Sequence, residues 1–278
     1  MQRDQLSTWA VREYKQGIDR PTSVGYIDST KHPLRVHYET ASLASRAQSI
    51  LEYAEDSWDF QVGVLGFRRP VGDYGGSEEG GSRDLDIYVG DLAYAAGVTV
   101  PEQDWVQSNH SDCTVHVVIT DQIMGGDLAT TVAHEFNHVL QAAHDCSEWI
   151  AFWENTANYI MDVTFDTVND YIYTLPDFQQ NPSLPFDLFQ SGSGYQYGAS
   201  LVPMTFDEAV GNGDGIAVRR IWEACEQTCP ILPAPQRMDL GPLDRHAIEE
   251  LIWNQARNVH TVLDDLTARQ IAEHVWYL

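Results

Sequence analysis

One uninterrupted stretch limits most strongly what this 278-residue chain can fold into. It begins with Asp127, a good N-cap residue after Gly125-Gly126, and the next sixteen residues contain neither proline nor glycine. The pentapeptide His134-Glu135-Phe136-Asn137-His138 lies inside it. Because residues four apart share one face of a helix, His134 and His138 can direct two imidazoles at one ion. The stretch therefore predicts a helix that carries two metal ligands.

Glu135 indicates which reaction the two histidines serve. It lies one step around the helix, where its carboxylate can reach a water molecule on the ion without occupying the same position. Two neutral nitrogens and a nearby carboxylate base are what a hydrolytic zinc site requires. We therefore predict one Zn²⁺ per chain, with Glu135 as the general base. A catalytic zinc has three protein ligands and one open position, so a third ligand is needed.

Glu154 is the first candidate for the third ligand. It lies in the apolar and aromatic run 149–162, which contains no proline or glycine and predicts a second buried helix. A carboxylate in such surroundings is unfavourable unless it is paired or binds a metal, and an arginine partner is the alternative. The fifteen residues between His138 and Glu154 allow the second helix to return antiparallel to the first. Asn158, one turn further on, is placed to hold a ligand by a hydrogen bond.

His144 is the second candidate, because the three histidines have the H-E-x-x-H-x-x-x-x-x-H spacing of metzincin peptidases. Those enzymes have glycine where this chain has Gln141, and glutamine does not readily adopt the left-handed conformation. A continuous helix places His144 about 120° away from His138. Glu154 is therefore favoured, and His144 is predicted to be a helix-end residue.

Three segments carry a likeness to a known family. They are His134-Glu135-Phe136-Asn137-His138-Val139-Leu140-Gln141, Trp153-Glu154-Asn155-Thr156-Ala157-Asn158-Tyr159 and Tyr195-Gln196-Tyr197-Gly198. Together they resemble the gluzincin metallopeptidases and, more narrowly, a largely uncharacterised set of predicted secreted microbial zinc metalloproteases. The likeness covers roughly residues 30 to 225.

This resemblance implies that His134, His138 and Glu154 bind zinc and that Glu135 is the general base. The chain departs from the family pattern at two positions. Tyr159 replaces the more usual tryptophan, and Met161 stands where an acidic residue often occurs. Neither position belongs to the ligand set, so the resemblance still implies a reaction class, although it implies no substrate.

The hydrophobic pattern predicts an α+β fold with a zincin-like layout. We expect a mixed N-terminal lobe over residues 1–145, which carries the metal helix, and a mainly helical lobe over 146–278, which carries the third ligand. The expected strands are 34–38, 61–67, 85–89 and 114–119, and the expected helices are 41–58, 198–210, 215–226, 243–259 and 267–276, with a connection over 176–194. The strand 114–119 is expected to be the edge strand that binds substrate, with His116 on its surface.

The predicted function is hydrolysis of peptide bonds by an endopeptidase. Glu135 removes a proton from the zinc-bound water and later delivers it to the leaving amine. Tyr197 or Tyr195 is a candidate donor to the oxyanion, while core packing is expected for at least one of them. An aminopeptidase would need an acidic anchor for the substrate amine, and no segment identifies one. The competing prediction is a catalytically silent, zinc-stabilised binding protein in which His144 fills the fourth position.

Composition limits the partners. The chain has 41 acidic and 16 basic residues, a net charge of −25, and its only lysines are Lys15 and Lys31. Nucleic acids and anionic membranes bind basic surfaces, so neither is expected as a partner. A peptide or protein substrate is expected, and the oligomeric state is left open. Calcium is conceivable for an acidic chain but unsupported, because Asn212-Gly213-Asp214-Gly215 is too short for an EF-hand and predicts a turn with a helix cap.

Four cysteines bear on the compartment. Their even number fits the two disulfides Cys113–Cys146 and Cys225–Cys229, although four thiols fit as well. No apolar run is long enough for a membrane span, and residues 1–5 lack a signal-peptide core. We expect an extracellular protein whose export signal is not in this chain, and the sequence leaves a cytoplasmic location open.

Overall fold

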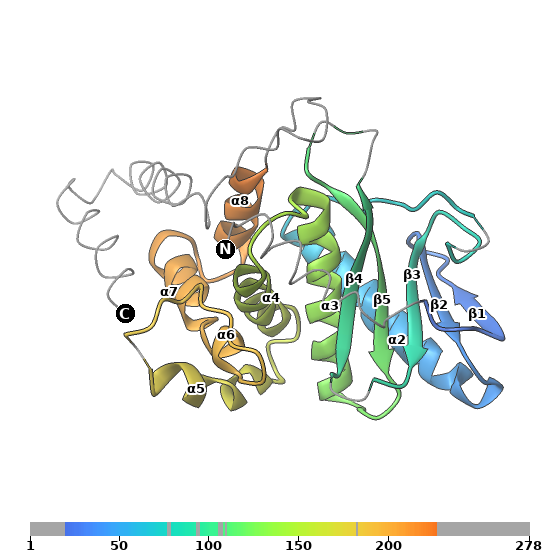
Figure 1. The fold of residues 1–278 in the computed structure, drawn as a ribbon, viewed down its shortest axis with the longest axis horizontal. Coiled ribbons are helices and arrows are strands. Elements are labelled where there is room, and N and C mark those ends of the chain that lie inside the picture. Colours follow the sequence, from blue (N-terminus) through green and yellow to red (C-terminus); the bar gives the residue numbers. More distant parts are fainter. Residues whose placement is uncertain are drawn as a thin grey trace.

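A five-stranded mixed sheet flanked by helices makes up residues 20–226, which the computed structural model describes except for 77–78, 93–94, 105–107, 109 and 182 (Figure 1). The strand order across the sheet is β1-β2-β3-β5-β4. The strands are β1 (Gly25–Asp28), β2 (Leu34–Tyr38), β3 (Leu85–Gly90), β4 (Gly97–Asp104) and β5 (Cys113–Thr120).

The three central strands, β2, β3 and β5, run parallel, and β1 and β4 join them antiparallel at the two edges. Every residue of β3 and β5 is buried, as expected for strands covered on both faces. The prediction that strand 114–119 lies at the edge is wrong, because β4 pairs with it on its outer side. β4 was not predicted. It contains Pro101, which a central strand would not accommodate but an edge strand does.

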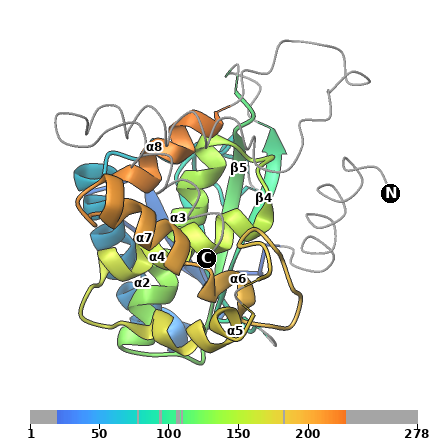
Figure 2. The ribbon, with the colours of Figure 1, turned by 90° about the vertical axis from the view of Figure 1, so that its left-hand side faces the viewer.

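Two helices, α2 (Ala44–Ser57) and α3 (Gly126–His144), pack against one face of the sheet (Figure 2). α2 confirms the predicted helix 41–58, whose first three residues form a 3-10 turn. α3 confirms the predicted metal helix, but its N-cap lies two residues earlier than the expected Asp127. Gly125 is the N-cap, with φ at 63°, so Asp127 lies in the first turn. Its charge still favours the helix there through the helix dipole.

The prediction of a strand over 61–67 is wrong, because η2 (Trp58–Val64) continues α2 as a π-helix. The buried side chain of Gln61 accounts for this conformation. Its amide nitrogen donates to the backbone oxygen of Ala133, and its amide oxygen accepts from the Asn137 side chain. Both partners belong to α3, so a contact distant in sequence fixes a segment whose local pattern is strand-like.

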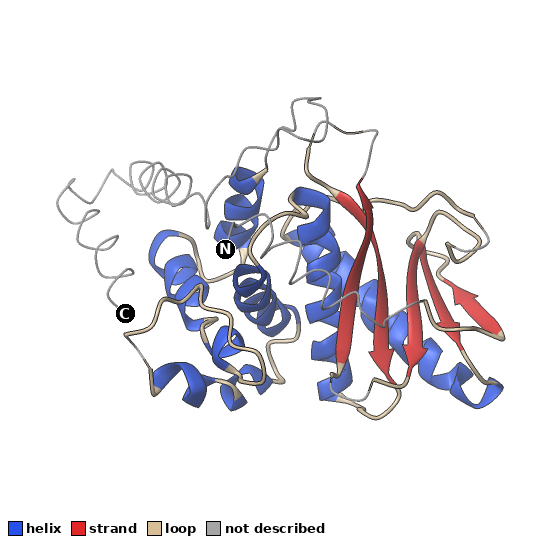
Figure 3. Cartoon of the chain, in the orientation of Figure 1, coloured by secondary structure: helices blue, strands red, loops and turns tan. Residues whose placement is uncertain are grey.

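The chain after α3 is helical, as predicted, and with the sheet it makes an α+β fold (Figure 3). The expected lobe boundary at 145/146 falls in the loop between α3 and α4, and the expected helices 243–259 and 267–276 lie outside the described residues. The helices that follow are α4 (Ile150–Thr164), η3 (Asp170–Tyr173), α5 (Leu175–Gln179), α6 (Tyr195–Gly198), α7 (Leu201–Val210) and α8 (Ile216–Cys225). None of the described helices is long and apolar enough to cross a membrane.

A disulfide between Cys113 and Cys146 confirms one of the two predicted pairings. It ties the first residue of β5 to the loop that follows α3, 33 residues later in the chain. Cys229 lies outside the described residues, so the Cys225–Cys229 pairing stays a prediction. The confirmed bridge fixes the position of the loop that leads from α3 into α4.

Candidate metal centre

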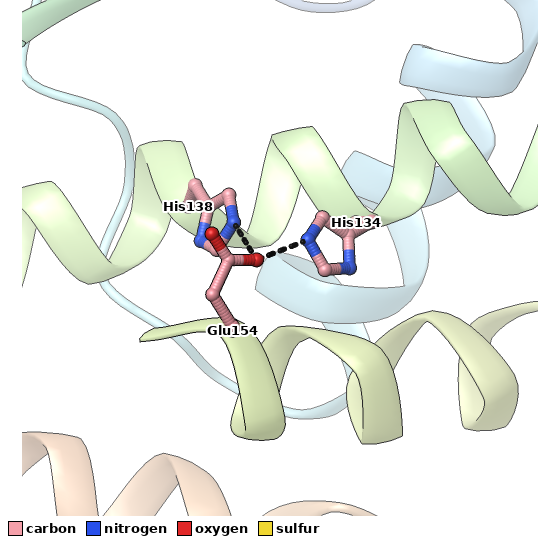
Figure 4. Close-up of side chains that lie close together, drawn as sticks. All are labelled: His134, His138 and Glu154. Carbon is pink, nitrogen blue, oxygen red and sulfur yellow. Dashed lines mark hydrogen bonds and ion pairs between the residues drawn. The ribbon is translucent and has the colours of Figure 1, made fainter. Parts of the chain in front are cut away.

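Three buried side chains from α3 and α4 converge on one point. His134 and His138 project from successive turns of α3, and Glu154 faces them from α4 (Figure 4). Oε2 of Glu154 lies 3.2 Å from Nε2 of His134 and 3.4 Å from Nε2 of His138. One donor atom from each residue lies within 4.8 Å of the other two. The structure thus brings together the three residues predicted as zinc ligands.

These distances fit a bound divalent ion. Two atoms that each lie about 2.1 Å from a zinc ion at a tetrahedral angle are about 3.4 Å apart. The two histidine-to-glutamate separations are close to that value. Two imidazole nitrogens and one carboxylate oxygen are also a common donor set of catalytic zinc. The residues present therefore fit the metal that the sequence predicts, in number, type and spacing.

Gln141 selects the histidine nitrogen that faces the ion. Its amide oxygen lies 2.7 Å from Nδ1 of His138, and its amide nitrogen donates to Asn137, Thr156 and the backbone oxygen of Trp153. Because the amide nitrogen has these acceptors, its oxygen must face His138, whose Nδ1–H then donates to it. In the neutral form that binds a metal, His138 would therefore have its lone pair on Nε2, the nitrogen that faces Glu154. Gln141 also links α3 to α4 and so fixes the spacing of the ligands.

The charges of this centre call for a cation. Glu135 and Glu154 are both buried, and no arginine or lysine of the described chain forms an ion pair with either. Burial raises the pKa of Glu135. Burial acts in the same direction on Glu154, but the charge of His138 and hydrogen bonds from both histidines hold its pKa below the ordinary value. A divalent ion supplies the two positive charges that two buried carboxylates need.

Glu135 is held by β4. The Thr99 hydroxyl donates to Oε2 of Glu135 across 2.8 Å. Gly97 provides the space for this side chain, because a Cβ atom there would lie 2.6 Å from Cγ of Glu135. Neither contact was predicted from the sequence. The alternation of valine with other residues in Gly97-Val98-Thr99-Val100 is the signal that could have indicated a strand at this place.

A cavity of about 450 Å³ opens beside the metal group. α3, α4 and β4 all contribute to its wall, together with the loop after α3 and the segment after α4. It is lined by Ala95, Ala96, Gly97, Val98, Thr99, Pro101, Thr131, His134, Glu135, His138, Cys146, Glu148, Ile150, Trp153, Glu154, Asn158, Met161, Asp170, Thr174 and Tyr197. The three predicted ligands and Glu135 therefore share one cavity with the edge strand.

The two tyrosines proposed as oxyanion donors lie in different surroundings. Tyr197 lines the cavity, with its ring centroid 5.9 Å from that of His134. Tyr195 is fully buried, and its hydroxyl donates to the backbone oxygen of Leu184.

Asn158 does not hold a ligand, contrary to the prediction. Its amide nitrogen donates to the backbone oxygen of Tyr197, so it positions the segment that carries Tyr197.

His144 is not part of the metal group. It is the last residue of α3, as predicted, but its ring is buried against Phe67. Nε2 accepts the backbone N–H of Arg68, so the Nδ1–H donates to the Glu226 carboxylate 2.7 Å away. Burial lowers the pKa of His144. The side chain is therefore a neutral hydrogen-bonding residue at the helix end.

Searches for similar proteins gave no match. No family model, curated protein or solved structure matches this chain.

Proposed function

We propose that this chain is a zinc-dependent metallopeptidase of the gluzincin type that cleaves within polypeptide chains. The observation that supports the proposal most directly is the convergence of His134, His138 and Glu154 beside Glu135 in one cavity. A structural zinc site is closed by four protein ligands, whereas a catalytic one has three and an open position. Within the described chain, the group offers three ligands, and the cavity gives access to the remaining position.

The residues divide the chemistry as follows. His134, His138 and Glu154 hold the zinc ion, which would supply the Lewis acidity that polarises a carbonyl group and acidifies a water molecule. Glu135 accepts the proton of the attacking water and delivers it to the leaving amine, because its carboxylate lies in the same cavity as the three ligands. Tyr197 is the proposed donor to the tetrahedral oxyanion.

β4 is the proposed docking strand for the substrate. It forms an edge of the sheet, and four of its residues line the cavity, Gly97, Val98, Thr99 and Pro101. An edge strand offers backbone N–H and C=O groups to an extended peptide, and such main-chain bonding accepts many sequences. This placement, together with the metal helix α3 and the third ligand on the following helix α4, supports a zincin-like layout.

The metzincin alternative has less support, because the two ring nitrogens of His144 are engaged by Arg68 and Glu226. The same contacts weaken the alternative of a silent site that His144 closes as a fourth ligand. The confirmed disulfide supports the expectation of an oxidising, extracellular compartment.

The proposal is tested by zinc content and by cleavage of an unstructured protein such as casein. Wild-type protein should contain one zinc per chain and lose activity with a chelator. Glu154→Gln should lose most of the zinc, whereas His144→Asn should keep it and serves as the matched control. Glu135→Gln should keep zinc and lose activity by at least about 100-fold. Wild-type protein without zinc, or an active Glu135→Gln variant, would contradict the proposal.

A further inference from the structure

Three buried amide side chains form a continuous row that ends at a proposed zinc ligand. Gln61, Asn137 and Gln141, which we call the amide row, are all fully buried. The amide nitrogen of Asn137 donates to Oε1 of Gln61 across 3.1 Å, and the amide nitrogen of Gln141 donates to Oδ1 of Asn137 across 2.8 Å. Oε1 of Gln141 lies 2.7 Å from Nδ1 of His138. A residue of η2 is thereby connected to the metal centre.

The end of the amide row away from His138 is fixed by a group that can only accept. The amide nitrogen of Gln61 donates to the backbone oxygen of Ala133 across 3.0 Å and to the Thr164 hydroxyl oxygen across 3.2 Å. A backbone oxygen has no proton to donate, so an inverted Gln61 amide would place two acceptors against each other in the interior. Oε1 of Gln61 therefore faces Asn137 and offers it an acceptor.

Each amide then determines the orientation of the next one. Because Gln61 offers an oxygen, Asn137 must turn its NH₂ group toward Gln61 and its own oxygen toward Gln141. Gln141 in turn directs its nitrogen to Asn137 and its oxygen to His138. Donors and acceptors thus alternate without conflict from Nδ1 of His138 to the backbone oxygen of Ala133. The row begins and ends on α3, the helix that carries both histidine ligands.

The backbone around Gln61 is unusual. Gln61 lies in the middle of η2, a seven-residue π-helix, and this rare conformation occurs frequently at functional sites. An apolar side chain could occupy an interior position without any hydrogen bond, whereas a buried amide needs partners for both its nitrogen and its oxygen. On α3, Ala133 accepts from the nitrogen of Gln61 and Asn137 donates to its oxygen. The polar residue at this place therefore serves the metal helix.

We propose that Gln61 and Asn137 are positioning residues for the metal centre. Through Gln141 they hold the His138 imidazole with Nε2 facing Glu154, as zinc binding requires. The proposal rests on the proposed zinc site, and cleavage of a substrate is not part of it. Gln141 has two further acceptors on α4, so it is not released completely when the row is interrupted. The expected rise in the zinc dissociation constant is therefore about 3- to 10-fold, less than the loss of a direct partner of a ligand causes.

The test separates zinc affinity from the stability of the fold. Gln61→Met should weaken zinc binding about 3- to 10-fold, because the Asn137 amide loses its acceptor and turns away from Gln141. It should also destabilise the metal-free protein, because a buried N–H group is left without a partner. Competition with a chromophoric zinc chelator measures the affinity, and urea denaturation of metal-free protein measures the stability.

The double variant Gln61→Met with Asn137→Leu distinguishes positioning from a purely structural role. Replacing both partners of a hydrogen bond by apolar groups is nearly neutral, so most of the stability should return. The zinc affinity should stay weak, because Gln141 still lacks the acceptor that Asn137 provides. A structural role predicts instead that the affinity recovers together with the stability.

Tyr159→Phe is the matched control. Tyr159 lies on α4, the helix of Glu154, and its buried hydroxyl donates to Asp207 across 2.8 Å. The substitution removes a buried hydrogen bond that has no connection to the amide row. It should lower the stability and change the zinc dissociation constant by less than about twofold.

An NMR signal of His138 gives an independent measurement. In isotope-labelled protein loaded with zinc, the Nδ1 proton of His138 should resonate downfield, because it donates a hydrogen bond to Gln141. Gln61→Met should move this signal upfield, whereas Tyr159→Phe should leave it in place.

Two results would overturn the proposal: a zinc affinity within about twofold of wild type in Gln61→Met, or full recovery of the affinity in the double variant. Failure of the proposed peptidase function is distinguishable, because wild-type protein that binds zinc without cleaving casein still allows every one of these measurements. Wild-type protein that binds no zinc would refute both proposals.

Discussion

The hydroxyl of Thr99 on the edge strand β4 donates a hydrogen bond to the Glu135 carboxylate on α3, with 2.8 Å between Oγ1 and Oε2. The same hydroxyl oxygen lies 3.0 Å from the backbone oxygen of Glu135. The strand proposed to bind the substrate therefore also orients the proposed general base. One oxygen of Glu135 is held by this bond, and the other remains available for a proton.

Thr99→Val should lower kcat by about tenfold and change KM by less than about twofold, because it removes the hydrogen bond and keeps the shape of the side chain. Thr99→Ser retains the hydroxyl and should restore most of kcat. Steady-state kinetics on a fluorogenic peptide measures both constants. A loss in Thr99→Val that appears mainly in KM, or that Thr99→Ser shares, would contradict a positioning role for the hydroxyl.

Gly97→Ala should lower activity by about 10- to 100-fold while the zinc content stays at one per chain. The added Cβ would lie 2.6 Å from Cγ of Glu135, so this side chain must move. Activity and elemental analysis of the same preparation check the prediction. Gly63→Ala is the control, because a Cβ there meets nothing closer than 4.0 Å. Full activity of Gly97→Ala would show that Glu135 does not need its present position.

Arg20 lies at the centre of a buried ionic cluster on the side of the sheet away from α2 and α3. Its guanidinium forms two hydrogen bonds of 2.7 Å with Glu102 and further ion pairs with Asp86 and Asp73. Asp86 also binds His37. Glu102, another partner of Arg20, binds His116. The prediction that His116 lies on the surface is wrong, because its side chain is buried. One arginine thus balances three carboxylates, two of which lie on β3 and β4, the strands on either side of β5.

Arg20→Met should lower the free energy of unfolding by about 3 to 5 kcal/mol, because it leaves buried carboxylates without a counter-charge. Urea denaturation with an unchanged m value measures this loss. Lys31→Met removes an exposed cation whose partner, Glu55, keeps the hydrogen bond from Ser29, and it should have a much smaller effect. Equal effects of the two substitutions would show that the Arg20 cluster is no more important for stability than the ion pair of the exposed Lys31.

Asp162→Asn should stabilise the protein at pH 8 but not at pH 4. Burial raises the pKa of Asp162 from 3.8 to about 6 in the folded state, so folding favours its protonated form. The stability that this preference contributes is fully present below the pKa of the unfolded state and is lost as the pH rises through about 6. At pH 8 the free energy of unfolding of the variant should exceed that of wild-type protein by about 1 to 2 kcal/mol. This is less than the free energy that corresponds to the full pKa shift, because solvent screens part of the interaction. Thermal unfolding from pH 4 to pH 8 measures it, and a gain that does not depend on pH would refute the assignment.

Local patterns were enough to predict several parts of the molecule. The spacing of His134 and His138 on an uninterrupted helical stretch depends only on the helical repeat, and α3 has it. The apolar run around Glu154 likewise predicted α4, since a carboxylate in such a run needs a charged or metal partner. These features are encoded by neighbours within a few turns, so the candidate ligands could be named from the sequence.

Other predictions failed because the deciding contact lies far away in the chain. The segment around Gln61 forms a π-helix because the Gln61 side chain is hydrogen-bonded to α3, although the neighbouring residues have a strand-like pattern. Asn158 was expected to support a ligand, but it bonds to Tyr197 nearly forty residues later. Gln141 was noted only as the absence of a glycine, yet its side chain sets the orientation of His138.

The sequence by itself determined the two helices that carry the candidate ligands, α3 and α4, and the side-chain types at the candidate metal centre, because helical periodicity and side-chain type are local properties. The tertiary structure decided which residues surround that centre. It placed β4 and Thr99 against Glu135, placed Asp170 in the cavity, and placed His144 outside the metal group. Those neighbours come from segments that meet only after the sheet and helices pack, and side-chain packing across such distances leaves no periodic signal in the sequence.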